Sequence, residues 1–177
     1  MSRTLFALAV AALVAANAGA TDFPLTGKNT KVEFVGTKPG GKHTGGFADV
    51  SGKATVDGDA ASLKLDVTIA TDSLYSDDAK LTSHLKAPDF FAVKDHPKAT
   101  FKSTKVEKTA TGYSVTGDLT LVSKTKSVTF PATVAATAAG LKLTSEFTIN
   151  KGDWGMNYGK GKIDDVVKLT VTVDTTK

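Results

Sequence analysis

Strict alternation of apolar and polar residues over eight stretches constrains the fold of this chain more than any other feature. In the stretch 62–71, for example, Leu65, Val67 and Ile69 alternate with charged or hydroxylated residues. Successive side chains of a strand point to opposite faces, so this period of two predicts antiparallel β-sheet with one buried face. A sheet whose strands all direct their apolar residues to the same side must close on itself or fold over. We therefore predict an all-β protein with strands at Lys31–Lys38, Gly46–Asp57, Ser62–Thr71, Lys98–Lys108, Thr111–Ser123, Ser127–Thr137, Leu141–Asn150 and Asp165–Thr175.

The first twenty residues have the pattern of a secretory signal peptide. Arg3 precedes a short apolar run, and Ala18-Gly19-Ala20 supplies small residues for cleavage. We expect cleavage after Ala20, a periplasmic or secreted mature chain, and no stable membrane insertion of that chain. An uncleaved anchor is the alternative. Residues 21–177 are predicted to form a single domain, because they contain no linker and no internal repeat.

Composition narrows the classes of function. The chain has no Cys, so it has no disulfide framework and no thiol chemistry. Loss of Arg3 lowers the formal net charge from +4 to +3, and the lysines are interspersed with acidic residues. This distribution does not support a nucleic-acid footprint. Nine Phe against three Tyr and one Trp favour a dry interior over a stacking platform for bases or sugars.

Two stretches interrupt the alternation. The segment Asp72–Phe91 shows helical spacing between Ser73, a candidate N-cap, and Pro88, which ends the helix; a second helical turn is expected at Asp89–Val93. This short helical segment between the third and fourth strands could cover one end of a barrel. The glycine-rich stretch 150–164 contains the only Trp and the only Met of the mature chain, and a loop of this length is usually functional or mobile. Pro131 lies within a predicted strand and suggests an edge, a bulge or a bend there.

A search for catalytic and metal-binding motifs finds none. The chain has no G-x-S-x-G, no H-E-x-x-H, no phosphate-binding glycine loop and no Cys nucleophile. His43, His84 and His96 have no partner at metal-ligand spacing within their own segments. The pair Asp77-Asp78 is explained by a helix start, and Asp164-Asp165 by a turn before the last strand. We predict no catalytic residue, no metal site and no cofactor.

The inward-facing apolar surface is the remaining candidate for function. A closed sheet of about eight strands is either filled by its own side chains or holds one ligand. If a cavity exists, an isoprenoid tail of several units offers on the order of 10 kcal/mol or more of gross transfer free energy, before ordering costs. A filled core is the alternative.

Several runs of residues are similar to the signature of the YceI-like family. They are Leu81–Phe91, His96–Ser103, Gly117–Leu121 and Asp153–Met156, which occur in the order of the family pattern. The resemblance covers essentially the whole mature chain. It implies an exported, lipocalin-like, eight-stranded antiparallel barrel that carries or stores a polyisoprenoid, such as an isoprenoid quinone, in its central pore. The family usually has Gly in the turn after Leu121, where this chain has Val122-Ser123, so we expect a changed turn here.

The resemblance, together with strand parity, predicts the residues of the site. His84 is a candidate contact for a ligand head group, although hydrogen bonding to a loop is the favoured role. Only one of the consecutive Phe90 and Phe91 is expected to face the cavity. The predicted apolar pore is formed by Phe34, Phe47, Leu65, Val67, Phe91, Phe101, Leu119, Leu121, Phe130, Phe147, Trp154 and Met156.

Three hypotheses about function follow. The first is a non-enzymatic carrier whose only partner is an isoprenoid lipid. The second is an enzyme of unknown reaction that uses the same pocket, with His84 or the Asp-rich ends as acid–base groups. The third is a structural β-domain with a filled core. A homodimer is compatible with such a barrel, and the sequence contains no signature for one.

Overall fold

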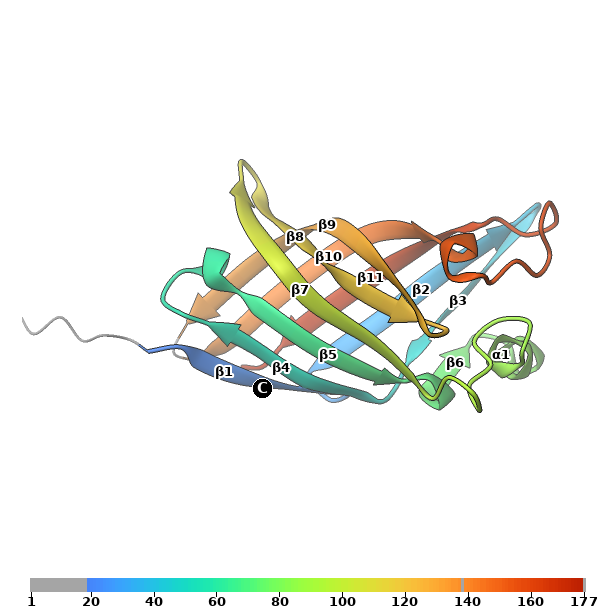
Figure 1. Ribbon diagram of the computed structural model, residues 1–177, viewed down its shortest axis with the longest axis horizontal. Coiled ribbons are helices and arrows are strands. Elements are labelled where there is room, and N and C mark those ends of the chain that lie inside the picture. Colours follow the sequence, from blue (N-terminus) through green and yellow to red (C-terminus); the bar gives the residue numbers. More distant parts are fainter. Residues whose placement is uncertain (1–18, 138, 177) are drawn as a thin grey trace, which may run out of the picture.

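The computed structural model describes residues 19–137 and 139–176. Within these residues, eleven antiparallel strands form one curled sheet, with a single short α-helix at one end (Figure 1). This confirms the predicted all-β antiparallel class, whereas the predicted count of eight strands is wrong. The strands are β1 (Thr21–Thr26), β2 (Thr30–Lys38), β3 (Gly41–Phe47), β4 (Val50–Val56), β5 (Lys64–Ala70), β6 (Leu74–Ser76), β7 (Lys98–Thr109), β8 (Gly112–Leu121), β9 (Lys124–Thr137), β10 (Gly140–Asn150) and β11 (Val166–Asp174).

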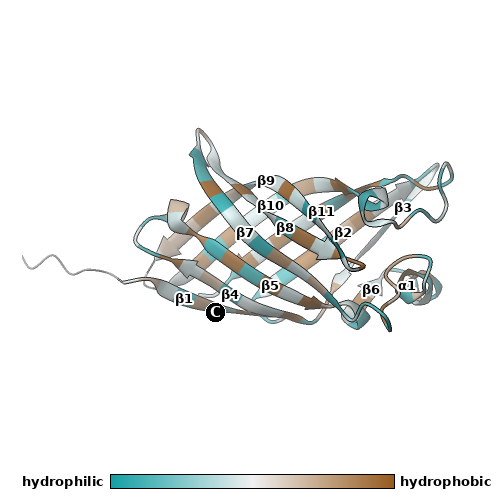
Figure 2. Ribbon diagram, in the orientation of Figure 1, coloured by the Kyte–Doolittle hydropathy of each residue, from teal (hydrophilic) through white to brown (hydrophobic). Residues whose placement is uncertain are grey.

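The order of the strands explains why the sheet curls. Neighbours follow the order β1-β4-β5-β7-β8-β9-β10-β11-β2-β3-β6. Only residues 27–29 separate β1 from β2, although the two strands lie far apart in this order. The ladder must therefore wrap round until its two sides meet again at this connection. Hydropathy alternates along the strands, so each strand presents one apolar face (Figure 2).

One bend and two strands outside the predicted ones, β1 and β6, account for the difference in strand count. The predicted strand Gly46–Asp57 is divided at Ala48–Asp49 into β3 and β4. The bend between β1 and β2 lies against it, since a Cβ on Gly27 would be only 2.1 Å from the carbonyl oxygen of Ala48. A side chain at position 27 would prevent this close approach, so glycine is required. Strand β1 lies outside the predicted strands. It contains Pro24, which it tolerates as an edge strand paired only with β4.

The helical segment is shorter than predicted. Helix α1 spans Ala79–Lys86, and its N-cap is Asp78, which accepts a hydrogen bond from the backbone N–H of Leu81 at 2.7 Å. Ser73 is not the cap; it ends the 3-10 turn Thr71–Ser73, which is followed by β6. The helix ends before Pro88, as predicted. Hydrogen-bonded turns replace the second helical turn expected at Asp89–Val93.

The other 3-10 turns are short and lie in connections, at Ala60–Ser62 and Lys151–Trp154. The latter opens the long connection between β10 and β11 that was predicted as a loop. Pro131 lies in β9, where the pairing with β10 stops at Thr133 and Thr144, and the carbonyl oxygen of Pro131 accepts a hydrogen bond from the Ser145 hydroxyl instead. Since proline has no N–H to donate, the ladder ends beside it.

The interior consists of two apolar clusters. The first, which we call the filled half, contains three close phenylalanine rings: Phe130 lies 4.4 Å from Phe147 and 5.4 Å from Phe101 between ring centroids. The second, which we call the pocket half, lies toward α1 and the β10–β11 connection. Its buried residues are Phe47, Val50, Ile69, Leu74, Phe90, Ala99, Leu119, Leu121, Trp154 and Met156.

No helix in the described part of the chain has both the length and the apolar character needed to cross a membrane.

Candidate apolar binding pocket

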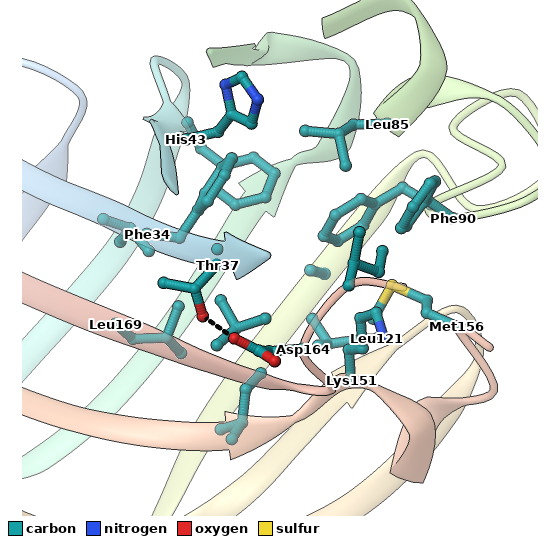
Figure 3. A pocket seen from close by; sticks show the side chains of 18 of the residues that line it. Phe34, Thr37, His43, Leu85, Phe90, Leu121, Lys151, Met156, Asp164 and Leu169 are labelled. Atoms are coloured by element: carbon teal, nitrogen blue, oxygen red, sulfur yellow. Dashed lines mark hydrogen bonds between the residues drawn. The ribbon is translucent and has the colours of Figure 1, made fainter. Parts of the chain in front are cut away.

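A pocket of about 190 Å³ opens in the pocket half, between the β2–β3 hairpin, α1 and the β10–β11 connection (Figure 3). None of the buried side chains of the filled half lines it. Its walls are almost entirely apolar. The lining residues are Val32, Phe34, Gly36, Thr37, Lys38, His43, Phe47, Ile69, Leu81, Leu85, Phe90, Phe91, Ala99, Leu119, Leu121, Ile149, Lys151, Met156, Ile163, Asp164, Val167 and Leu169.

The alternation of side chains along each strand determines which residues form the pocket walls. Val32, Phe34 and Gly36 are alternate residues of β2, so their side chains share the inward face. Leu119 and Leu121 of β8 line the opposite wall by the same rule. Gly36 leaves part of the β2 wall bare, because a Cβ built on it meets nothing within 4 Å.

Close packing of aromatic rings shapes the side of the pocket formed by β3. A Cβ on Gly45 would lie 2.4 Å from the ring of Phe34, so the absence of a side chain lets this ring lie flat across β3. The ring of Phe34 packs against that of Phe47, with 6.4 Å between the ring centroids. Phe47 packs edge-on against Phe91, with 5.6 Å between the centroids. This chain of rings joins β2, β3 and the segment after α1.

Helix α1 and the turns that follow it cover the pocket. Leu81 and Leu85, one helical turn apart, both face it. Both Phe90 and Phe91 also line it, so the expectation that only one of them would do so is wrong. The two residues lie in hydrogen-bonded turns and not on a regular helix, which allows consecutive side chains to converge.

The β10–β11 connection is anchored by Trp154. Its indole is 2% exposed, and the indole N–H donates to the carbonyl oxygen of Leu119 at 3.1 Å. Trp154 therefore fills the space behind the wall, while Met156 and Ile163 from the same connection reach the pocket itself. A buried Trp with its N–H satisfied is a stable anchor for a long loop.

Lys151 and Asp164 form a polar corner of the pocket. The Lys151 side chain is only 6% exposed, and its Nζ lies 2.5 Å from Oδ1 of Asp165. This hydrogen bond, together with the positive charge, lowers the pKa of Asp165. Next to it, the Thr37 hydroxyl donates to the carboxylate of Asp164 (Figure 3). The corner can therefore meet a polar group at the end of an apolar ligand.

A second polar contact ties β3 to the segment that leads into α1. The Asp77 carboxylate accepts a hydrogen bond from the backbone N–H of Thr44 at 2.9 Å, and its other oxygen lies 2.9 Å from Nδ1 of His43. Both hydrogen bonds lower the pKa of Asp77, and the one from the Thr44 backbone has the larger effect. We call this contact the β3 latch, because it holds the cover of the pocket to the sheet.

His84 lies outside the pocket lining. Its Nε2 is 3.2 Å from Oδ2 of Asp89. Its ring packs edge-on against the rings of Phe90 and Tyr158, at centroid distances of 5.2 Å and 4.5 Å. These contacts join α1 to the β10–β11 connection. The role of His84 as a head-group contact stays a prediction.

The predicted pore residues divide between the two clusters. Six line the pocket: Phe34, Phe47, Phe91, Leu119, Leu121 and Met156. Trp154 packs in the same cluster behind the wall, and Val67 and Phe101 lie against both clusters. Leu65, Phe130 and Phe147 belong to the filled half. Whether the predicted pore residues contact a ligand is not tested by where they lie, so those contacts stay a prediction.

Sequence reasoning missed several lining residues. Val32, Gly36, Val167 and Leu169 follow from the same parity that identified Phe34. No feature of the sequence indicates that Lys151 lines a pocket, because a lysine that follows a strand is normally exposed.

The histidines and acidic residues do not gather. His43, His84 and His96 each have a separate partner, which for His96 is the Ser123 hydroxyl at 2.8 Å from Nδ1. Over residues 19–137 and 139–176, no group of three or more His, Asp or Glu side chains could hold a metal ion.

The fold and pocket thus define a class: all-β, barrel-like proteins with an apolar pocket at one end of the curled sheet. The model of the YceI-like domain matches residues 23–175, so the chain belongs to this family. It is 37% identical over 146 residues to a UPF0312 protein of Pseudomonas putida (strain W619), a match that covers 75% of this chain and 73% of the relative.

Solved structures share the fold. Burkholderia cenocepacia BcnA superposes with a TM-score of 0.75 at 26% identity, over 81% of this chain and 94% of that one. A polyisoprenoid binding domain from Saccharophagus degradans, implicated in plant cell wall breakdown, gives a TM-score of 0.67 at 14% identity, over 86% and 95%. At that identity the second likeness concerns the fold alone.

Proposed function

We propose that this protein is a non-enzymatic carrier that holds the tail of an isoprenoid lipid in the apolar pocket. The observation that carries the proposal is the pocket itself, whose walls are almost entirely apolar and include a polar corner at Lys151 and Asp164. Membership of the YceI-like family and a fold shared with a polyisoprenoid binding domain support it.

The size of the pocket sets how much of a tail it holds. An apolar cavity of about 150 Å³ stays dry and accepts benzene, and this pocket has about 190 Å³. It therefore accommodates roughly one or two five-carbon isoprene units, and the rest of a longer chain would leave through the mouth. Each unit contributes about 4 kcal/mol of gross transfer free energy, which needs few polar contacts.

We also propose that the carrier acts outside the cytoplasm. The predicted signal peptide covers residues 1–20, of which residues 1–18 lie outside the described part of the chain. Strand β1 begins at Thr21, directly after the predicted cleavage site. The first strand of the sheet therefore begins at the first residue that would remain after cleavage. Edman sequencing of the exported protein should begin at Thr21, and an N-terminus that retains residues 1–20 would contradict this proposal.

A pocket-filling variant tests the carrier function. Gly36 lines the pocket, and a Cβ built on it would meet no atom within 4 Å, so Gly36→Phe should place its ring in the space of the tail. We expect its affinity for a fluorescent geranylgeranyl probe to fall about tenfold or more, since burial of one isoprene unit is lost. The matched control, Gly36→Ser, should bind as the wild type does.

Lipid extraction and mass spectrometry of the purified wild type and both variants should agree with the titration. A prenyl lipid should accompany the wild type and Gly36→Ser and be depleted from Gly36→Phe. If Gly36→Phe keeps its folded circular-dichroism spectrum and still binds the probe with wild-type affinity, the tail does not occupy this pocket. Absence of any prenyl lipid and of probe binding in the wild type would favour a structural domain.

A further inference from the structure

The end of the molecule at which the pocket opens carries four lysines, which we call the tip lysines: Lys38, Lys42, Lys160 and Lys162. Lys42 pairs with Thr37 across the β2–β3 hairpin, and Lys38 follows Thr37 directly. The backbone N–H of Asp164 donates to the carbonyl oxygen of Thr37 at 2.9 Å, which brings the β10–β11 connection beside the same hairpin. Figure 1 shows this connection next to the tip of β2 and β3.

The charge of the tip lysines is directed to solvent. All four are exposed, and none forms an ion pair with another residue of the described ranges. Two acidic residues nearby have basic partners: Asp165 pairs with Lys151, and Asp77 pairs with His43 in the β3 latch. Asp164 accepts a hydrogen bond from the uncharged Thr37 hydroxyl and keeps its negative charge, which the four lysines outnumber.

An exposed aromatic side chain accompanies this charge. Tyr158 lies in the same connection as Lys160 and is 48% exposed, with one side of its ring against His84. Tyrosine suits the boundary between water and lipid, because its ring is apolar and its hydroxyl is polar. A basic tip with an exposed tyrosine, at the mouth of an apolar pocket, has the composition of a surface that meets anionic lipid headgroups.

From these observations we infer that the tip lysines and Tyr158 dock this end of the protein on a negatively charged lipid bilayer. The inference rests on the proposed carrier function for its purpose, since docking there would bring the pocket mouth to the membrane from which a tail enters. Electrostatic attraction falls off within a Debye length, so the docking is reversible and sensitive to salt.

Co-sedimentation with vesicles tests the docking surface. The wild type should bind vesicles in which a third of the phosphatidylcholine is replaced by phosphatidylglycerol, and should not bind phosphatidylcholine alone. The variant with Lys38, Lys42, Lys160 and Lys162 all changed to Gln should bind about tenfold more weakly or worse. Raising the salt to about 0.5 M should release the wild type.

A second quadruple variant controls for net charge. Lys28, Lys31, Lys64 and Lys108 are exposed and lie away from the tip, so their change to Gln removes the same charge and should leave vesicle binding unchanged. Equal loss in both quadruple variants would overturn the inference, because binding would then depend on net charge alone. Equal binding of the wild type to neutral and anionic vesicles would also overturn it.

Titration with the geranylgeranyl probe in solution separates this inference from the carrier function. A triple variant that changes Lys42, Lys160 and Lys162 to Gln, and keeps Lys38 because it lines the pocket, should dock poorly on vesicles but bind the probe as the wild type does. Gly36→Phe should dock on vesicles while binding the probe poorly. Retained docking with no probe binding in the wild type would refute the carrier function and leave the docking surface standing.

Discussion

At the scale of single residues, the turn between β8 and β9 carries an unusual backbone. Val122 and Ser123 form a two-residue connection, with φ of 48° and 57°. Two positive φ values are typical of the hairpin turns that favour Asn-Gly, and a β-branched residue is strained there. The changed turn expected from the missing glycine is thus a strained one. It lies directly after Leu121, a pocket residue.

A pair of substitutions measures this strain. Val122 packs partly against the pocket half, so Val122→Ala removes that contact and keeps the unfavourable φ. Val122→Asn removes the same contact but tolerates the left-handed conformation. We expect the Asn variant to exceed the Ala variant by about 1 kcal/mol in free energy of unfolding, measured by urea denaturation. Equal stabilities would show that the turn relaxes without cost.

Lys151 shows the limit of sequence reasoning at this scale. Alternation identifies inward positions only within a strand, and Lys151 follows β10 in a 3-10 turn. Its burial depends on Asp165, which follows fourteen residues later and supplies the opposite charge. Such a pair is produced by the path of the connection, which no local pattern describes.

At the scale of elements, the β3 latch determines how firmly the cover of the pocket is held. Asp77→Ala removes the acceptor of the Thr44 N–H and the partner of His43. We expect hydrogen exchange of the Thr44 amide to accelerate roughly tenfold, with little change in the amides of β8. Hydrogen-exchange mass spectrometry or NMR measures both. Unchanged exchange at Thr44 would mean that the backbone pairing of β3 with β6 holds this end without the carboxylate.

Most long strands could be predicted from the sequence, whereas the short elements could not. A period of two over ten or more residues, as in β8 and β10, is a strong signal because burial of one face imposes it. Strand β6 has three residues, too few for a period, and its place beside β3 depends on the bend at Ala48–Asp49. Bends, edge prolines and caps are set by tertiary contacts, so they produced the errors in strand count and helix start.

At the scale of the whole molecule, four carboxylates link stability to pH. The pKa values of Asp22, Asp77, Asp165 and Asp174 are all lowered. That of Asp174 falls to about 2, through hydrogen bonds from the Thr176 hydroxyl and backbone N–H and then from Lys142. A folded pKa below the unfolded value of about 3.9 means that the charged form stabilises the fold.

Acid should therefore destabilise the protein in a defined range. The contribution of each carboxylate is complete above about pH 4 to 5 and is lost as the pH falls through its folded pKa, which for Asp174 extends the loss to about 2. Thermal unfolding followed from pH 6 to about 2 should show a falling midpoint, and the fall should be shallower in Asp174→Asn. Parallel curves for the wild type and this variant would contradict the assignment.

The molecule as a whole has an apolar interior with a pocket at one end. Parity identified inward residues in both halves, but it could not say which of them touch each other. Phe130 and Phe147 stack and fill their half, whereas Gly36 and the cover formed by α1 leave space in the other. The division depends on which side chains face one another across the curled sheet, and that is a property of the register between distant strands.

Methyl NMR of the protein titrated with a geranylgeranyl ligand tests the central claim most directly. We predict shifts of the methyl groups of Leu121, Ile149, Met156 and Ile163, which line the pocket, and unchanged methyl groups of Val134, Leu141 and Leu143 in the filled half. Shifts concentrated in the filled half, or no shifts at saturating ligand, would contradict the account.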